Sequence, residues 1–286
     1  MTTLTVLGSG SRGNALAIAS EGKVLLVEAW FSTRELRRRA EQAGVDLGAL
    51  CGIALTHEHH DHARGAVRLA RQTGVPVLAS PGTWSALGGL GDQGFIPVRP
   101  GSRTESGPFT ISGCGILHDA REPLALTVTA AEGIALGVAF DFGRPTQALR
   151  YHFRALDAVV VESNYDEVML RTSGYPVAVQ HRIAGSGGHL SNRATARFLE
   201  ELFQPSLGTV VLAHLSQQCN TPELARETVE PVLRARGFRG VVHVAVQDAP
   251  LPATKLTHGS AATSGHQKEL GLGIVGASSG PRSGSP

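Results

Sequence analysis

The chain has 286 residues, of which 42% are hydrophobic and 17% are charged, a composition that can bury a globular core. Its net charge of +2 is too small to indicate a polyanionic partner by itself. Its three cysteines, Cys51, Cys114 and Cys219, form no Cys-x-x-Cys pair, which excludes a disulfide framework and a cysteine zinc site.

The first half of the chain is predicted to be rich in strands. Apolar or β-branched runs bounded by turn residues predict strands at residues 4–7, 14–19, 24–28, 52–56, 75–79, 109–114, 124–130 and 134–141. The sequence Ser32-Thr33-Arg34-Glu35 is a capping box and predicts a helix to about Ala43. Ala63, Ala66 and Ala70 share one apolar face, which predicts a second helix.

The second half alternates strands and helices. Strands are expected at residues 158–162, 209–214 and 241–246, and helices are expected to begin near Ser191 and at Thr221-Pro222-Glu223. Two strand-rich halves with helices between them predict two packed sheets with helices outside, in one domain over residues 1–249. A doubly wound sheet is the alternative, but the hairpin-like start argues against it.

The remaining residues, 250–286, are rich in Gly, Ser, Ala and Pro and are expected to form a disordered tail. No apolar run approaches the roughly 20 residues of a membrane span. The N-terminus lacks the basic and apolar regions of a signal peptide. We therefore expect a cytoplasmic protein with reduced thiols and no membrane partner; its oligomeric state is left open.

The run His57-Glu58-His59-His60-Asp61-His62 carries the strongest chemical signal. It directly follows a predicted strand and precedes a predicted helix, so its side chains can converge on one space. Imidazole and carboxylate are the ligands that zinc and similar divalent metals prefer. We expect His57, His59, Asp61 and His62 to bind metal and His60 to face solvent or to support the ligands. The alternative, a solvated loop without ligands, is disfavoured by this density of donors.

This motif resembles the signature of the metallo-β-lactamase superfamily, whose fold is an αββα sandwich of two mixed β-sheets flanked by helices. The resemblance implies two divalent metal ions, zinc foremost, with manganese or iron as alternatives. It implies further ligands at His118, Asp141 and His214, which lie at predicted strand ends in that order. One metal would bind His57, His59 and His118, the other Asp61, His62 and His214, and Asp141 would bridge them.

Further motifs narrow the resemblance to the YycJ/WalJ-like branch, whose members are associated with DNA exonuclease activity. These motifs include the turn 8–14 after the first strand and the runs 118–120, 162–164, 188–192 and 214–216. Glu162 and His189 also resemble the pair that assists the leaving group in tRNA 3′-processing endonucleases. His189 could instead only cap the helix at Ser191.

The resemblance places the catalytic roles on Asp61, Asp141, Glu162 and His189. Candidate substrate-binding residues are Ser9, Ser11, Asn14, Asn164 and Ser216. The glycine-rich turn 8–14 can be a phosphate cradle or only a tight turn. Arg12 and Arg34 are candidates for contact with backbone phosphates, whereas arginine runs such as 37–39 are usually solvated helix faces.

One departure concerns the family's usual Asp-x-Gly, which is Glu28-Ala29-Trp30 here. That aspartate normally supports the histidine loop, so local packing must differ. The expected function is metal-dependent hydrolysis of phosphodiesters in DNA by an exonuclease. The first alternative is an ester or thioester hydrolase of the same fold, resembling glyoxalase II or lactonases. The second is a regulatory protein with a structural metal.

Overall fold

The computed structural model describes residues 1–88 and 94–258 of the chain and contains two seven-stranded sheets. The first sheet has the strand order β14-β1-β2-β3-β4-β5-β6. Its strands are β1 (Thr3–Gly8), β2 (Ala15–Ser20), β3 (Lys23–Val27), β4 (Leu50–Ala54), β5 (Val77–Ala79), β6 (Phe95–Pro97) and β14 (Thr254–Lys255).

The second sheet has the order β13-β12-β11-β10-β9-β8-β7. Its strands are β7 (Arg103–Ser106), β8 (Phe109–Gly115), β9 (Leu124–Ala130), β10 (Ala135–Ala139), β11 (Ala158–Glu162), β12 (Thr209–Ala213) and β13 (Val241–Val244). Both sheets are mixed. Strands β1 to β3 and β7 to β10 pair antiparallel, whereas β3 to β6 and β10 to β13 pair parallel.

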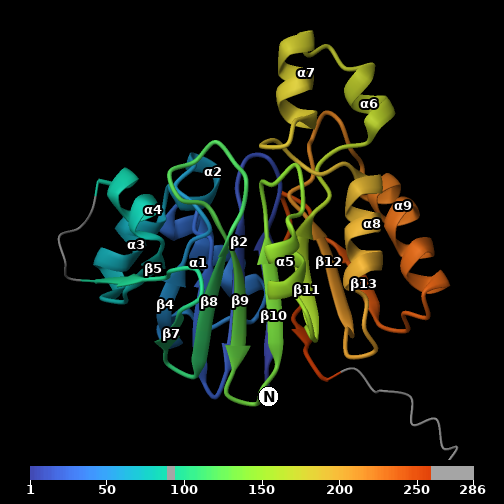
Figure 1. Cartoon of the computed structure of the whole chain (residues 1–286). Helices are drawn as coiled ribbons and strands as arrows, with labels where there is room; N and C mark the ends of the chain where they lie inside the picture. Colours follow the sequence, from blue (N-terminus) through green and yellow to red (C-terminus); the bar gives the residue numbers. More distant parts are fainter. Residues whose placement is uncertain (89–93, 259–286) are drawn as a thin grey trace, which may run out of the picture.

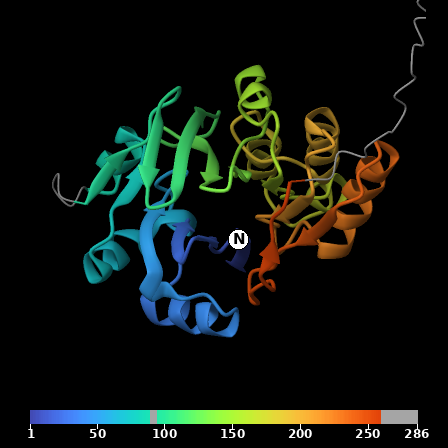
Figure 2. The same ribbon diagram turned by 90° about the horizontal axis from the view of Figure 1, so that it is seen from below.

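The helices lie outside the two sheets (Figure 2). They are α1 (Thr33–Gln42), α2 (His60–Ala63), α3 (Ala66–Thr73), α4 (Pro81–Ala86), α5 (Gln147–His152), α6 (Glu167–Arg171), α7 (Val177–Ala184), α8 (Asn192–Leu202) and α9 (Pro222–Ala235), with a 3-10 turn, η1 (Leu47–Ala49). Helices α1 and α3 pack on the first sheet, and α5, α8 and α9 pack on the second. The architecture is therefore the expected αββα sandwich.

The main core lies between the sheets, where the inward side chains of both meet. Leu16 and Val27 from the first sheet join Ile111, Leu126 and Val160 from the second, and all five are buried. Burying a side chain of this size is worth about 1.5–3 kcal/mol. This core holds the two sheets rigidly together, so the loops at one end of the sandwich keep a fixed relative position.

Capping residues explain where the predicted helices begin. The side chains of Ser32, Ser191 and Thr221 each accept a hydrogen bond from a backbone N–H of the first helical turn. These N-termini were all predicted. The predicted helix after the histidine motif is instead divided into α2 and α3 at Gly65, whose N–H donates to the carbonyl of Ala29 at 2.7 Å.

The predicted boundary of the disordered tail, at residue 250, lies too early in the chain. Residues 254 and 255 form β14, which pairs antiparallel with β1, and Leu256 is buried against the main core. The prediction was therefore wrong for residues 250–258, because β1 offers an edge to which even two residues can pair. The rest of the predicted tail, residues 259–286, lies outside the described residues.

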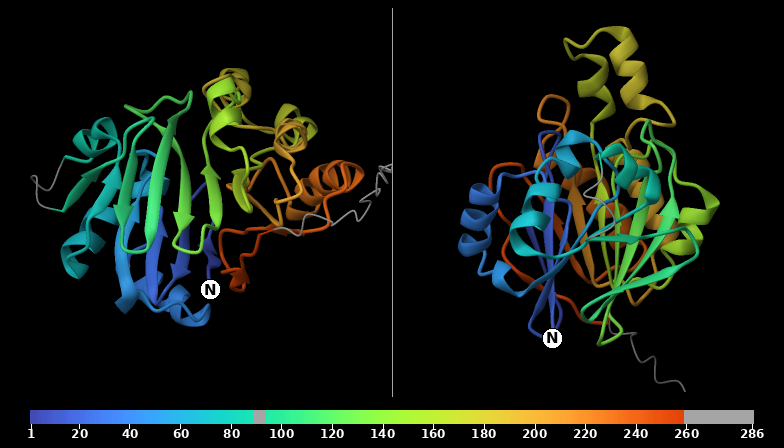
Figure 3. Two further views of the ribbon diagram at one scale, coloured as in Figure 1. Left: turned by 60° about the horizontal axis from the view of Figure 1, so that its bottom comes forward. Right: turned by 90° about the vertical axis from the view of Figure 1, so that its left-hand side faces the viewer.

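Helices α6 and α7 project beyond the sandwich at the end where α2 lies, and the N-terminus lies at the opposite end (Figures 1 and 3). They pack on a small cluster of Tyr165, Leu170 and Cys219. All three cysteines are free. In the part of the chain that the structure describes, no helix is long and apolar enough to cross a membrane.

Candidate metal centre

The carboxyl ends of the parallel strands bring the chemically active side chains together. Glu28 follows β3, Asp141 follows β10, Glu162 ends β11 and His214 follows β12. Because parallel strands point the same way, these residues meet at one end of the sandwich. The histidine motif joins them from the loop after β4. That strand ends at Ala54, two residues before the predicted end at residue 56, so His57 and His59 stand on a loop.

Backbone strain is concentrated at these strand ends. Glu28, Asp141 and His214 adopt φ values of 61°, 54° and 54°, in the left-handed region that residues with a Cβ seldom occupy. Such a conformation costs about 1–3 kcal/mol per residue and persists only where surrounding contacts enforce it. The strain turns each side chain sharply out of its strand toward the shared space.

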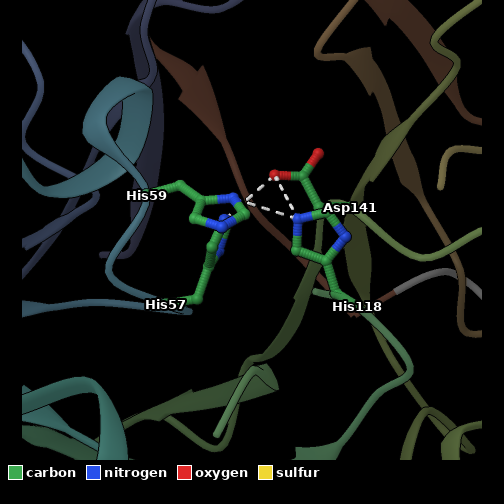
Figure 4. Close-up of side chains that lie close together, drawn as sticks. All are labelled: His57, His59, His118 and Asp141. Carbon is green, nitrogen blue, oxygen red and sulfur yellow. Dashed lines mark hydrogen bonds and ion pairs between the residues drawn. The ribbon is translucent and has the colours of Figure 1, made fainter. Parts of the chain in front are cut away.

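The first group of donors comprises His57, His59, His118 and Asp141, whose side chains point toward one another (Figure 4). Nε2 of His57 lies 3.1 Å from Oδ2 of Asp141, and Nδ1 of His59 lies 3.1 Å from Nε2 of His118. One donor atom from each residue lies within 4.8 Å of the others. This is the set that the resemblance implied for one metal, together with the bridging aspartate.

The second group comprises Asp61, His62, Asp141 and His214. Oδ2 of Asp61 lies 3.3 Å from Nε2 of His214 and 3.4 Å from Nε2 of His62. Nε2 of His62 is also 3.0 Å from Oδ2 of Asp141. Asp141 belongs to both groups, so its position fits the bridging role.

A third group shares two of these residues and adds Glu162 and His189. Nδ1 of His189 lies 3.1 Å from Oε2 of Glu162 and 3.1 Å from Oδ1 of Asp141. Oε1 of Glu162 accepts hydrogen bonds from the N–H groups of Phe142 and Leu190. The carboxylate is therefore fixed by the backbone and holds His189 at the edge of the centre. The N-cap residue of α8 is Ser191, so His189 does not cap this helix.

Buried donor atoms test whether these groups fit a metal. Within residues 1–88 and 94–258, Nε2 of His57, Oδ1 of Asp141 and Nδ1 of His214 are buried and make no hydrogen bond. Nδ1 of His214 lies 2.9 Å from Oδ1 of Asp141, but the two atoms lack hydrogen-bond geometry. Leaving such atoms without partners costs about 1–3 kcal/mol each. A bound cation would satisfy them, so the residues fit a metal.

Neighbouring groups orient several of the histidine rings. Nδ1 of His118 donates to the carbonyl of Gly187 at 2.8 Å, which directs its Nε2 toward His59. Nδ1 of His57 lies 2.9 Å from the hydroxyl oxygen of Thr56, which leaves its Nε2 facing Asp141. Such contacts select the ring tautomer that binds metal.

The departure at Glu28 still supports the ligands. Its side chain is fully buried, and Oε1 accepts a hydrogen bond from the N–H of Thr56. Oε2 lies 3.5 Å from Nδ1 of His62. The longer side chain therefore still reaches the histidine loop, through the backbone of Thr56 and the ring of His62. Trp30 packs against Gly13, where a Cβ would lie 2.0 Å from its ring, so the two residues are matched in size.

The pKa values of the metal-free centre keep its two aspartates ionised. Burial alone raises the pKa of Asp141, but the charges of His214 and His62 outweigh it and hold the pKa well below the ordinary value. The pKa of Asp61 is also lowered, because hydrogen bonds from His214 and His62 outweigh its burial. Burial lowers the pKa of His57, which keeps its imidazole neutral and able to bind metal.

The predicted substrate-binding residues occupy different positions. Ser9, Asn14 and Asn164 are buried, and their side chains hold the centre's loops. The hydroxyl of Ser9 accepts from the N–H of His214 at 2.9 Å, and Nδ2 of Asn164 donates to the carbonyl of His214 at 2.8 Å. Nδ2 of Asn14 lies 3.3 Å from Nε2 of His62. The structure gives these three side chains supporting roles.

Ser11 and Ser216 differ from these three because they reach the surface. Ser11 is exposed on the turn after β1, and Ser216 is half-buried and accepts the N–H of Cys219 at 3.1 Å. Their contact with substrate stays a prediction. Arg12 and His60 are exposed. His60 therefore faces solvent, which is one of the two positions expected for it.

Two contributors were not found from the sequence. Oε1 of Glu58 accepts the N–H of Arg121, and its Oε2 accepts the hydroxyl of Thr83. Glu58 therefore ties the histidine loop to the loop that carries His118. Asp119 pairs with Arg182 of α7 at 2.7 Å, which ties the projecting helices to the centre. Only the position of each next to a predicted ligand could have indicated them.

Comparisons with known proteins place the chain in a family. Residues 8–191 match the family described as "Metallo-beta-lactamase superfamily". The chain belongs to the metallo-β-lactamase superfamily. Among solved structures, the metallo-β-lactamase fold protein YhfI from Bacillus subtilis has a TM-score of 0.66 at 19% identity, covering 87% of this chain and 98% of that one. Human tRNase Z, short form, has a TM-score of 0.58 at 14% identity, covering 87% and 98%.

The sequences of two relatives align with most of this chain. "Exodeoxyribonuclease YycJ" of Bacillus anthracis is 34% identical over 239 residues, covering 82% of this chain and 90% of the relative. "Exodeoxyribonuclease WalJ" of Streptococcus pneumoniae serotype 2 is 28% identical over 260 residues, covering 88% and 96%. The resemblance noted from the sequence is thereby confirmed, as is the metallo-β-lactamase fold. The fold and the clustered histidines and aspartates indicate divalent-metal binding.

Proposed function

We propose that this superfamily member is a metal-dependent exonuclease that hydrolyses phosphodiester bonds of DNA. The observation that carries the proposal is the position of His189, held by Glu162 beside a complete set of metal donors. A site that only stores a metal needs about four ligands and no proton donor. The two relatives named exodeoxyribonuclease support DNA as the substrate.

We assign one metal to His57, His59 and His118 and the other to Asp61, His62 and His214, with Asp141 shared between them. Two divalent ions bound there would lower the pKa of a water molecule and offset the negative charge of the phosphodiester. Zinc suits this donor set best, and manganese or iron also bind such ligands. Because three carboxylates stand among the histidines, the protein attracts cations before the substrate arrives.

The chain itself supplies the proton for the leaving group. Hydrolysis forms a bond between the water oxygen and phosphorus and breaks the bond to the departing sugar oxygen. That oxygen leaves as an alkoxide unless it receives a proton. Burial lowers the pKa of His189, but Asp141 and Glu162 outweigh it and raise the pKa to about 9. In the metal-free protein this keeps His189 protonated at neutral pH, and a protonated ring held by Glu162 in this position can donate to the leaving oxygen.

The alternative of an ester or thioester hydrolase shares the metal centre, because the superfamily fold hosts several hydrolytic reactions. A thiolate leaving group does not need a proton, whereas a sugar alkoxide does. The Glu162–His189 pair thus disfavours a thioester, and the two relatives named exodeoxyribonuclease support a phosphodiester over a carboxylic ester. A purely structural metal is disfavoured for the same reason, because the pair would have no task.

Metal analysis combined with cleavage of end-labelled single- and double-stranded DNA tests the proposal. Wild-type protein is expected to hold about two metals per chain and to release nucleotides from one end. Asp61→Ala is expected to lose one metal and most of the activity. Metal binding without DNA cleavage would move the assignment to a small ester or thioester. Failure to bind zinc or manganese would overturn the metal centre itself.

A further inference from the structure

A groove runs between helices α1 and α3 on the outer face of the first sheet. Two adjoining cavities form it, of about 450 Å³ and 760 Å³, and both are lined by Arg34 and Arg68. The first also contains Trp30 and Arg64, and the second contains Arg37. The two cavities share lining residues, so they form one continuous depression.

Arginine side chains dominate the charge of this α1–α3 groove. Arg34 and Arg37 stand three residues apart on α1 and so share a helix face, whereas Arg64 follows α2 and Arg68 lies on α3. Within residues 1–88 and 94–258, none of these four guanidinium groups takes part in an ion pair or side-chain hydrogen bond. Each therefore has its donors available to a ligand.

The acidic residues of the groove do not cancel this charge. Glu35 is paired with Arg38, in contact through two hydrogen bonds, and with Arg39 at 2.7 Å. The hydrogen bond from Arg38 lowers the pKa of Glu35 to about 2. Glu41 is the remaining acidic residue in the lining. Four unpaired arginines against one carboxylate leave a net positive groove on a chain whose total charge is only +2.

The groove begins next to the metal centre. The carbonyl of His62 accepts the N–H of Ala29 at 2.7 Å, and the carbonyl of Ala29 accepts the N–H of Gly65 at 2.7 Å. Trp30 and Arg64 therefore lie directly behind a metal-site histidine. The more exposed donors of the centre, Asp61 and His59, have side-chain exposures of 28% and 34% and lie at the start of α2, the short helix that Arg64 caps at its C-terminal end.

We propose that the α1–α3 groove binds the sugar–phosphate backbone of the DNA strand whose end is held at the metal centre. This inference rests on the proposed nuclease function and adds the path of the strand. Arginine forks bind phosphate oxygens in pairs without reading the base, which suits an exonuclease that acts on any sequence. Trp30 lines the groove at the end nearest the centre.

The length of the groove sets the strand length it can hold. Helix α1 has 10 residues, which at about 1.5 Å per residue spans about 15 Å. One strand advances about 3.4 Å per nucleotide when stacked, so the groove holds roughly four nucleotides. A dinucleotide bound at the centre cannot reach along it, whereas a strand of about 20 nucleotides fills it.

The test compares Arg34→Gln/Arg68→Gln with Arg236→Gln/Arg239→Gln. The control pair is exposed near the end of α9 and removes the same charge far from the groove. Binding of a labelled single strand of about 20 nucleotides is measured by anisotropy at several salt concentrations, with the Asp61→Ala substitution added to both full-length variants to suppress cleavage and with the same zinc concentration throughout. Nucleotide release from that strand and from a dinucleotide is measured with Asp61 intact.

The groove variant is expected to bind the long strand at least tenfold more weakly than the control. Its logarithmic salt slope is expected to be shallower by about 1.4, because each lost phosphate contact removes about 0.7. The kcat/KM for the long strand is expected to fall at least tenfold more than that for the dinucleotide. Equal binding and equal salt slopes in both variants would contradict the proposal that the groove binds the strand.

The outcomes separate the groove from the nuclease. If the wild type releases nucleotides and the groove variant behaves like the control, the groove does not bind the strand, but the proposed nuclease function is supported. If DNA binds with a salt slope that differs between the groove variant and the control but no nucleotide is released, the groove binds DNA and the proposed nuclease function is wrong. A protein that neither binds nor cleaves DNA overturns both.

Discussion

Nδ1 of His189 lies 3.1 Å from Oε2 of Glu162. The other oxygen of this carboxylate accepts two backbone N–H groups, so the carboxylate cannot turn away from the ring. His189 also lies 3.1 Å from Asp141, which belongs to both sets of metal donors. The same ring could thus deliver a proton or bind a metal, and a substitution distinguishes these roles.

His189→Asn should lower kcat for DNA by about 10²- to 10⁴-fold, the usual loss on removing a general acid. A phosphodiester with a p-nitrophenyl leaving group needs no proton, so its hydrolysis should fall much less. The ratio of the two losses is the measurement, with metal content determined on the same samples. Equal losses together with a missing metal would make His189 a ligand and contradict its role as proton donor.

Glu28→Ala should weaken metal binding about 10- to 100-fold, because the buried carboxylate orients His62 and the backbone of Thr56. Zinc titration against a competing chelator measures this change. Glu21→Ala on the exposed turn before β3 is the matched control and should bind zinc as the wild type does. If both variants bind equally well, Glu28 does not support the site.

Metal removal should destabilise the protein, because Nε2 of His57, Oδ1 of Asp141 and Nδ1 of His214 are buried without a hydrogen-bond partner among the described residues. A metal present at about 1,000 times its Kd stabilises the folded state by about 4 kcal/mol, so chelation should lower Tm. Asp141→Asn should lose both metals because both groups share this residue, whereas Asp61→Asn should lose one. Elemental analysis checks the counts, and full metal content in Asp141→Asn would rule out the bridge.

The metal-free protein should lose stability as the pH rises from about 6.5 to 9. The pKa of His189 is raised to about 9 in the folded protein, above its ordinary value of 6.5. A raised pKa means that the folded state keeps a proton that the unfolded state releases. The contribution to stability is therefore full below pH 6.5 and lost as the pH passes through 9.

Urea unfolding in the presence of a chelator, at intervals between pH 6 and 10, measures this dependence. His189→Asn lacks the titrating ring and should show a shallower decline over the same interval. The decline should not vanish, since His62 and His214 also have pKa values raised by their carboxylate neighbours. A slope that is the same with and without His189 would show that its pKa is ordinary.

Local patterns predicted much of the fold because they determine the elements that carry them. The caps at Ser32, Ser191 and Thr221 and the strand pattern of residues 124–130 each reappear in the structure. Helix α7 escaped prediction because it has no side-chain cap and buries none of its residues, so its sequence shows no apolar face. Strands β6 and β7 are short and lie at sheet edges with little burial, which weakens their pattern.

Only part of the candidate site could be predicted from local sequence patterns. The density of donors from His57 to His62 indicates a metal in any context. His118, Asp141 and His214 are far apart in the chain, and only the pairing of parallel strands brings them together. Glu58 and Asp119 act through hydrogen bonds to neighbours, which no sequence pattern specifies. Family resemblance indicated the distant ligands, whereas the contacts of Glu58 and Asp119 depend on how the loops meet in the folded chain.

Gly65→Ala should destabilise the protein by about 1–3 kcal/mol through overpacking. A Cβ at this position would lie 2.4 Å from the carbonyl oxygen of Phe31 and 2.7 Å from that of Ala29, and backbone atoms cannot move aside as a flexible side chain can. Gly174→Ala is the control, because a Cβ there meets nothing within 4 Å among the described residues. Urea unfolding of the metal-free proteins compares them directly.

The position of Gly65 also links this substitution to the metal centre. Its N–H bonds to Ala29, whose own N–H bonds to the carbonyl of His62, so a shift at residue 65 displaces that ligand. Gly65→Ala should therefore weaken zinc binding as well as folding, whereas Gly174→Ala should change neither. Zinc affinity unchanged in a destabilised Gly65→Ala protein would mean that the close approach at Gly65 serves only the packing of α3 and not the position of His62.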